Sequence, residues 1–445
     1  MPHWLRNSLL ALAALAVAGL ALSWRPSIDA AAPPGRQAFA PGLIEQGARL
    51  AAVGNCVSCH TASPSSPFAG GRPMETPFGT VYSTNITPDA ATGIGAWPEA
   101  AFARALREGV ARDGSHLYPA FPYDHYTRLT DRDIHALYAY VMTREPVTAP
   151  ARSNRLVFPL NFRPLLAGWK LLFLDRAPWT PVAGHDDSWN RGAYLSDALG
   201  HCSACHSPRN ALGAEDRKRY LDGGDAEGWH ATALNASSPS PLPWTVDKLA
   251  VYLRTGIAPG HAIAGGPMQE VVAGLAHADD ADVRAIASYI HATLGADTPE
   301  RQARAEKSSR MAQQPLAASA TAGTVPGAPA DPAPATQMAQ MALGAQVYAG
   351  ACARCHDAGR EIGSAGALPM PLAIANHVPD ARNLLRIVRD GVHPGPNAPG
   401  RWMPAFGDTL TDEQLTALAA WLRRQAAGAP PWPDLADTVR KTRTP

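Results

Sequence analysis

The six cysteines of this chain occur in three copies of one five-residue pattern, Cys-x-x-Cys-His. The copies are Cys56-Val57-Ser58-Cys59-His60, Cys202-Ser203-Ala204-Cys205-His206 and Cys352-Ala353-Arg354-Cys355-His356. Two thiols one helical turn apart can add to the two vinyl groups of one haem, and the adjoining imidazole can then bind the iron. This is the pattern of c-type haem attachment. The sequence therefore predicts three covalently bound haem c groups, with His60, His206 and His356 as the proximal iron ligands.

Two other uses of a Cys-x-x-Cys pair fit this chain less well. A structural zinc site needs four ligands, and each pair has only its own histidine nearby. A redox dithiol does not require that histidine, and the βαβ pattern that surrounds such a dithiol is missing. Repetition with no cysteine left over favours haem attachment.

The length and charge of the chain limit its class. Its 445 residues are enough for three or four small domains. The formal net charge is +1, and there is no basic stripe that could neutralise a phosphate backbone, so we expect no nucleic-acid partner. No catalytic triad, paired-carboxylate site or phosphate-binding loop is evident. We therefore expect no catalytic residues.

The N-terminus reads as a signal segment or a membrane anchor, over residues 1–25. Arg6 precedes an apolar run that extends from Leu9 to Leu22. The nearest small-residue cleavage site, at 30–32, is followed by two prolines, which favours an uncleaved anchor. Arg6 on the near side places the rest of the chain on the periplasmic side of the bacterial inner membrane, where haem c is attached.

Two helices recur around each predicted haem site. A short helix leads into the pattern and carries a glycine, Gly47, Gly192 or Gly344, that permits close approach of another helix. A longer amphipathic helix follows each site. Its apolar positions are Ile134, Leu137, Tyr138 and Val141; Val283, Ile286, Ala287 and Ile290; and Leu415, Leu418, Ala419 and Leu422. Thr130 with Asp133 resembles a capping box at one helix start, and Thr411 with Gln414 fits one fully.

This repeat resembles the class I cytochrome c fold, in which two terminal helices cross beside the haem. The resemblance implies a mostly α protein with three such domains in tandem behind the N-terminal anchor. The predicted organisation is domain 1 at 43–148, an apolar segment packed between domains at 149–186, domain 2 at 187–295, a flexible linker at 296–337, domain 3 at 338–427 and a tail at 428–445.

The sixth iron ligand of a class I domain is usually a methionine in the loop before the last helix. Met403 and Met268 occupy such loops in domains 3 and 2. The corresponding loop of domain 1, at 116–122, has no methionine. Met142 is the leading substitute, with Met74 and His116 in reserve. If no residue binds the first iron, it is five-coordinate and binds small ligands.

Longer motifs extend the resemblance over the whole chain after the anchor. They are Phe68-Ala69-Gly70-Gly71, Thr76-Pro77-Phe78-Gly79-Thr80, Ser83-Thr84-Asn85-Ile86-Thr87-Pro88-Asp89, Leu117-Tyr118-Pro119-Ala120-Phe121-Pro122-Tyr123 and Trp189-Asn190-Arg191-Gly192-Ala193-Tyr194-Leu195. The chain resembles the triheme cytochrome c subunits of bacterial membrane-bound dehydrogenases. That resemblance implies an electron carrier, not an enzyme by itself, that takes electrons from a catalytic subunit and delivers them to ubiquinone or a terminal oxidase.

Several details resemble the branch of this family whose catalytic subunit is a molybdenum hydroxylase for aldehydes or N-heterocycles. They include Trp24-Arg25-Pro26, Gly266-Pro267-Met268 and Pro431-Trp432-Pro433-Asp434-Leu435. The alternatives are a quinoprotein alcohol dehydrogenase and a flavoprotein for sugars or sugar acids. A different class, an autonomous haem peroxidase, is kept open by the missing loop methionine of domain 1.

Overall fold

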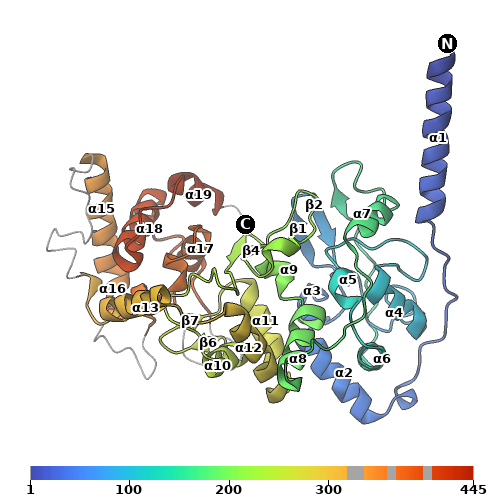
Figure 1. Cartoon of the computed structure of the whole chain (residues 1–445), viewed down its shortest axis with the longest axis horizontal. Coiled ribbons are helices and arrows are strands. Elements are labelled where there is room, and N and C mark those ends of the chain that lie inside the picture. The colour runs from blue at the N-terminus through green and yellow to red at the C-terminus, as the bar shows by residue number, and fades with distance from the viewer. Residues whose placement is uncertain (1, 318–334, 358–366, 394–402, 444–445) are drawn as a thin grey trace. The chain divides into compact units, whose positions relative to one another are not determined.

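The computed structural model describes residues 2–317, 335–357, 367–393 and 403–443. Helices dominate these residues and the strands are short, so the predicted mostly α fold is confirmed (Figure 1). The chain forms two compact units, the first comprising residues up to 204 with 277–279 and the second comprising 205–276 with 280–445. The boundary falls within helix α9 (Ser203–His206), inside the predicted domain 2, and the division into three domains stays a prediction.

The first unit holds the first haem pattern, on helix α3, and the helices around it. Its helices are α1 (His3–Ser23), α2 (Pro41–Val53), α3 (Cys56–Cys59), α4 (Glu99–Glu108), α5 (Tyr123–Tyr126), α6 (Asp131–Met142), α7 (Leu165–Phe173) and α8 (Asp187–Tyr194). Its one sheet among the described residues is antiparallel, in the order β1 (Pro73–Thr76), β2 (Gly79–Tyr82), β3 (Arg155–Leu156). Thr76 pairs with Gly79 across the tight turn, and Gly79 pairs with Leu156 on its other side.

The helix pair α2 and α6 frames the first haem pattern. Gly47 of α2 lies so close to α6 that a Cβ there would collide with the carbonyl oxygen of Ala136. All four predicted apolar positions of α6 are buried. Thr130 caps α6 by accepting a hydrogen bond from the backbone N–H of Asp133 (3.2 Å). The predicted crossing of two helices beside this pattern is thus confirmed.

The apolar segment at 149–186 has several exposed side chains. Phe158 is 87 % exposed, and Leu171 and Leu172 of α7 are 86 % and 68 % exposed. Only one side of α7 is covered, where the Trp169 ring meets the Tyr123 ring edge to face (centroids 6.0 Å apart). The sequence shows how apolar the helix is, but not which face is covered.

A buried lysine fastens α7 to the loop after α4. Lys170 is 5 % exposed. Its Nζ donates to the carbonyl oxygen of Gly109 (2.5 Å) and to Nδ1 of His116 (2.9 Å). The opposite nitrogen of His116, Nε2, donates to the carbonyl oxygen of Ser23 (2.8 Å). Burial lowers the pKa of Lys170 to about 7, with a further lowering from the positive charge of Arg176.

Replacing this lysine should change how stability depends on pH. Between about pH 7 and pH 10.5 an unfolded Lys170 binds a proton that the folded one does not, so the free energy of unfolding rises with pH across this window. We expect Lys170→Met to flatten that rise, measured as urea midpoints at several pH values. Lys218→Met, on an exposed turn, should keep the wild-type slope. Equal slopes for wild type and Lys170→Met would contradict the prediction.

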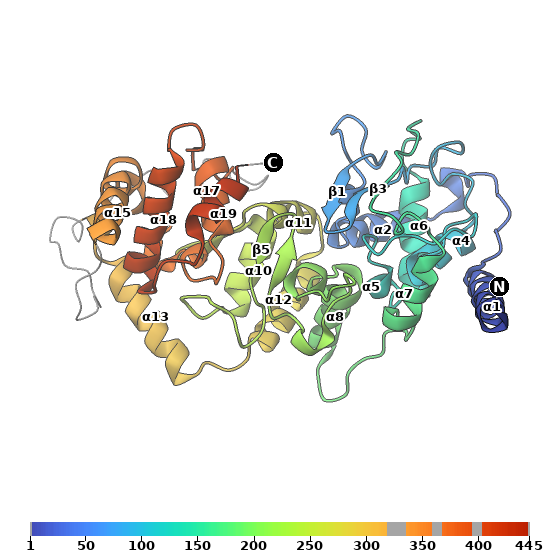
Figure 2. The same ribbon diagram turned by 90° about the horizontal axis from the view of Figure 1, so that it is seen from above.

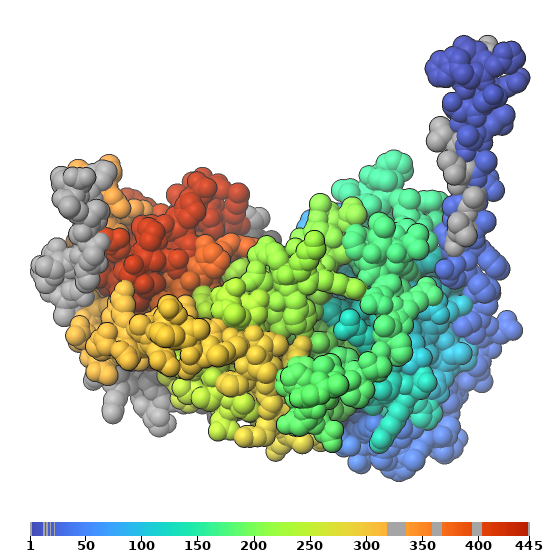
Figure 3. Space-filling view, viewed as in Figure 1, coloured from blue at the N-terminus to red at the C-terminus, as the bar shows by residue number. Residues whose placement is uncertain are grey.

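Helix α1 has exposed side chains along its length, among them Trp4 (67 % exposed) and Leu10 (62 % exposed), as the dark blue atoms of Figure 3 show. Among the described residues no helix meets the length and apolarity that a membrane span requires.

The second unit holds the third haem pattern, on helix α16, and the part of the chain that follows the second pattern. Its helices are α10 (Val246–Thr255), α11 (Pro267–Leu275), α12 (Asp280–Leu294), α13 (Pro299–Ala312), α15 (Ala335–Val347), α16 (Ala353–His356), α17 (Arg382–Asp390), α18 (Asp412–Ala427) and α19 (Leu435–Lys441). Two antiparallel hairpins accompany them, β4 (Gly224–Ala226) with β5 (Trp229–Ala231) and β6 (Ile257–Ala258) with β7 (Ala262–Ile263).

In the second unit α15 and α18 pack against each other, as α2 and α6 do in the first unit (Figure 2). A Cβ on Gly344 of α15 would collide with the carbonyl oxygen of Ala417 in α18. The predicted apolar positions of α12 and α18 are all buried. The capping box of Thr411 and Gln414 is present with both of its hydrogen bonds, as predicted.

Helices also form in the two segments predicted as linker and tail, α13 in the first and α19 in the second. Pro299–Ala312, in the predicted flexible linker, form α13, because Thr298 caps a run of good helix formers with proline at its first turn. The rest of that linker includes 318–334, which lie outside the described residues. The predicted tail packs on domain 3, where Trp432 is 6 % exposed and its indole N–H donates to the carbonyl oxygen of Val378 (2.9 Å).

Candidate haem sites

Each Cys-x-x-Cys-His pattern lies on a short helix that begins after a change in backbone direction. Asn55 before α3 and His201 before the second pattern have positive φ angles of 50° and 39°. A π-helical turn precedes the second and third patterns, at Leu195–Leu199 and Tyr348–Cys352. Such turns are rare and occur often at functional sites. The backbone thus places both cysteines and the histidine of a pattern within about one helical turn.

The three histidines each make the same kind of hydrogen bond, from Nδ1 to a backbone carbonyl oxygen. Nδ1 of His60 donates to the carbonyl oxygen of Thr84 (2.7 Å). Nδ1 of His206 donates to that of Thr232 (2.7 Å), and Nδ1 of His356 to that of Leu368 (2.8 Å). A carbonyl can only accept, so the proton sits on Nδ1 and the lone pair of Nε2 remains for a metal.

The charge state of these rings agrees with iron binding. Burial lowers the pKa of His60, His206 and His356, so each imidazole is neutral at pH 7. A neutral imidazole whose other nitrogen is held by a carbonyl is the usual state of a metal-binding histidine. Three neutral histidines, each next to a pair of cysteine thiols in the sequence, fit the attachment of haem c.

The thiols do not fit a redox dithiol. None of the six cysteines is in a disulfide. Burial and the neighbouring Cys59 raise the pKa of Cys56 to about 12, and burial with Cys355 does the same for Cys352. Reactive dithiols depend on a lowered pKa that favours the thiolate. These buried thiols have the opposite shift, which argues against the dithiol alternative.

The two predicted loop methionines lie at different places. Met268 is the second residue of α11 and follows Pro267, and Gly266 before this helix has a φ of 55°. Met403 pairs with Val392 in an isolated antiparallel bridge, with N–H to O distances of 2.9 Å in both directions, and is partly buried against the core of domain 3. Both are in the second unit and both precede the last helix of their predicted domain.

The three candidates for the sixth ligand of domain 1 lie in different surroundings. Met142 is 4 % exposed in a cluster with Ile94, Tyr138 and Val141, and Ile86 packs against that cluster. Ile86 is two residues after Thr84, the partner of His60, so the cluster lies against the segment that holds the proximal histidine. Both ring nitrogens of His116 are hydrogen bonded. Met74 lies in β1 opposite Val81.

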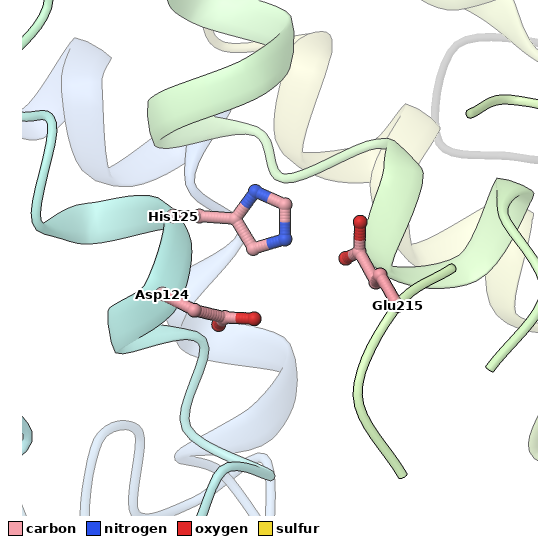
Figure 4. Close-up of side chains that lie close together, drawn as sticks. All are labelled: Asp124, His125 and Glu215. Atoms are coloured by element: carbon pink, nitrogen blue, oxygen red, sulfur yellow. The ribbon is translucent and has the colours of Figure 1, made fainter. Parts of the chain in front are cut away.

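Tyr126 is a residue near the first pattern that the sequence analysis missed. It is 6 % exposed, and burial together with Cys56 and Cys59 raises the pKa of its hydroxyl well above the usual value. The two thiols thus contribute to the electrostatic surroundings of Tyr126. It follows Asp124 and His125 on α5, whose side chains Figure 4 shows, and Nδ1 of His125 donates to the carbonyl oxygen of Asp197 (2.7 Å). A tyrosine so far along the chain from the cysteines gives no local signal.

Comparison with protein families gives two matches. Residues 44–145 match the family model described as cytochrome c. Residues 339–422 match the model described as cytochrome c oxidase, cbb3-type, subunit III. These ranges agree with the first and third predicted domains.

Curated relatives cover almost the whole chain. A nicotinate dehydrogenase subunit of Pseudomonas putida is 43 % identical over 436 residues, which are 97 % of this chain and 34 % of that protein. This chain therefore spans about a third of the length of that relative. The gluconate 2-dehydrogenase cytochrome c subunit of Pantoea cypripedii is 38 % identical, over 86 % of this chain and 85 % of its own length.

The fructose dehydrogenase cytochrome subunit of Gluconobacter japonicus is 36 % identical over 85 % of this chain and 78 % of its own length. All three names describe a subunit of a dehydrogenase, although the dehydrogenases differ. Together with the two family matches and the geometry of the three patterns, these relatives show that this chain belongs to the family of electron-transferring cytochrome c subunits of dehydrogenase complexes, which bind haem c covalently.

Proposed function

We propose that the chain binds three haem c groups and relays electrons from a separate catalytic subunit to a respiratory acceptor, ubiquinone or a terminal oxidase. The observation that carries this proposal is the hydrogen bond from Nδ1 to a backbone carbonyl, made alike by His60, His206 and His356. It supports one iron ligand at each pattern. A bound haem c supplies a one-electron iron couple.

The protein residues have distinct roles in this proposal. The six cysteines hold the macrocycles by thioether bonds, which keeps the cofactor attached outside the cytoplasm. The three histidines would hold the irons through Nε2. Met268 and Met403 would supply the sixth ligands of the second and third sites, and a thioether ligand favours reduced iron and raises the potential. We do not assign Met142 to the first site, since it is buried among Ile94, Tyr138 and Val141.

The packing around the patterns supports rapid electron transfer. The helices that cross beside the first and third sites bury their apolar faces, including Leu137 (4 % exposed) and Leu418 (1 % exposed). An apolar, densely packed shell responds little when the iron changes charge, so little reorganisation opposes the transfer. The chain itself oxidises no substrate in this proposal.

For the catalytic partner we propose a molybdenum hydroxylase that oxidises an N-heterocycle or an aldehyde. The nicotinate dehydrogenase subunit is 43 % identical to this chain, against 36 % for the fructose and 38 % for the gluconate dehydrogenase subunits. The second candidate, a quinoprotein or flavoprotein partner, has the support of those other relatives. The proposed location is the periplasmic side of the inner membrane, with attachment through the apolar N-terminal segment, in which Trp4, Leu10 and Val17 are exposed.

Isolation of the complex tests this function. A tagged full-length chain should co-purify with a subunit that contains molybdenum, and addition of an N-heteroaromatic acid such as nicotinate without oxygen should reduce the haems. Haem content by the pyridine haemochrome method should be three per chain. Co-purification of a flavin or quinoprotein subunit instead would overturn the molybdenum assignment. Peroxide turnover by the isolated chain would support the peroxidase alternative and overturn the carrier role.

A further inference from the structure

The loops before the last helix of domains 1 and 2 have the same backbone pattern. Helices α4 and α10 both have ten residues and both end at a glycine in the left-handed region, Gly109 (φ 59°) and Gly256 (φ 76°). Leu117 N donates to the carbonyl oxygen of Gly109 (2.7 Å), and Ala264 N donates to that of Gly256 (2.7 Å). Each of these bonds closes a loop of the same length. The two stretches of chain therefore run in register from the helix through the hairpin.

A second pair of hydrogen bonds extends this register beyond the loops. Arg107 Nη2 donates to the carbonyl oxygen of Leu129 (2.9 Å), 22 residues ahead. Arg254 Nη1 donates to that of Ala276 (3.0 Å), also 22 residues ahead. Because both hydrogen bonds span 22 residues, neither loop has an insertion relative to the other.

This register pairs each residue of one loop with one residue of the other. Met268 is the twelfth residue after Gly256, and the twelfth residue after Gly109 is Phe121. Phe121 therefore stands in domain 1 where Met268 stands in domain 2. A phenyl ring has no lone pair that could bind iron.

The surroundings of Phe121 connect it to the first haem pattern. Its ring meets the ring of Tyr126 edge to face (centroids 5.4 Å apart) and lies near that of Tyr123 (6.5 Å). Burial, with smaller contributions from Cys56 and Cys59, raises the pKa of the Tyr126 hydroxyl. Phe121 and Tyr126 form an aromatic wall at the loop position that Met268 occupies in domain 2, in place of a sulfur ligand.

We propose that the first haem site has no protein ligand at the sixth position of the iron, because Phe121 replaces the methionine that Met268 supplies in the second site. The aromatic wall favours small neutral ligands over anions, so the reduced site binds diatomic molecules such as carbon monoxide. This inference rests on the proposed function, since it takes three haems and a Met268 ligand as given.

Carbon monoxide is the probe for this site. The purified full-length chain, reduced with dithionite, should bind one molecule of carbon monoxide per three haems. Phe121→Met should bind none and should gain the absorption band of a ferric iron with a thioether ligand. Met268→Phe should bind two molecules per chain. Phe121→Leu is the matched control, because it removes the ring without adding a ligand and should still bind one.

The measured haem content distinguishes a failure of the proposed function from a failure of the open-site inference. A variant enters the comparison only with the same haem content per chain as the wild type, which shows that its domains have folded. Fewer than three haems in the wild type would contradict the proposed function. Three haems with no carbon monoxide binding would leave that function intact and overturn the open site. Unchanged binding in Phe121→Met would overturn the equivalence of Phe121 and Met268.

Discussion

A chain in which Cys202 and Cys205 are both replaced by alanine is expected to carry two covalently bound haems in place of three. Without the two thioether bonds no covalent link to the second haem remains, and only the iron ligands His206 and Met268 would tie it to the chain. Intact-protein mass should fall by one haem in addition to the change in side chains. Electron transfer from the catalytic partner to quinone should fall by about 100-fold or more, since even outer-shell changes at metal sites cost about 10-fold to 100-fold.

Two comparisons make this result specific. Ala204→Ser changes a residue between the two thiols and should keep three haems and the full rate. The same double substitution at Cys56 and Cys59, or at Cys352 and Cys355, should also remove one haem each. A double alanine variant at Cys202 and Cys205 whose mass still contains three haems would contradict haem attachment at this pattern.

Gly344→Val is expected to cause a large loss of stability in the second unit. The new side chain would meet the carbonyl oxygen of Ala417, which belongs to the backbone of α18 and cannot rotate away. Pushing α15 from α18 should lower the free energy of unfolding by about 3 kcal/mol. Calorimetry should show the transition of this domain about 10 °C or more lower.

The control for this substitution is Gly350→Ala in the same predicted domain. No atom lies within 4 Å of a Cβ at Gly350, and that residue is exposed. We expect a change of less than about 1 kcal/mol, since alanine is favoured over glycine in helical backbone. Similar losses for both glycines would show that the helix crossing is not responsible.

Much of the fold is predictable because its signals are local. The apolar positions of α6 and α18 follow the helical period, and the capping box of Thr411 and Gln414 lies within four residues. Asp133 shows the limit of such signals. In a capping box its carboxylate would accept from the backbone N–H of Thr130. That N–H donates to Tyr194 Oη instead (3.2 Å), and Asp133 accepts from Tyr194 Oη (2.6 Å), 61 residues away.

The features that the sequence did not predict depend on distant backbone or on burial. Lys170 lies in an apolar run, and its neighbours in the sequence do not show that Gly109 and His116 accept its hydrogen bonds. The exposure of Leu171 was missed because hydropathy does not indicate whether a partner covers a helix face. The equivalence of Phe121 and Met268 requires hydrogen bonds that fix the register on both sides of a loop.

The hydrogen bond that orients each proximal histidine has a consequence for how these sites tolerate mutation. Its acceptor is a main-chain oxygen, in Thr84, Thr232 and Leu368 respectively. Two of these residues have a hydroxyl side chain and one has an aliphatic side chain, but in all three the acceptor is the main-chain carbonyl oxygen. A point mutation at any of the three leaves the acceptor in place. The residues that supply these acceptors can therefore change during evolution, while the hydrogen bond still orients each imidazole.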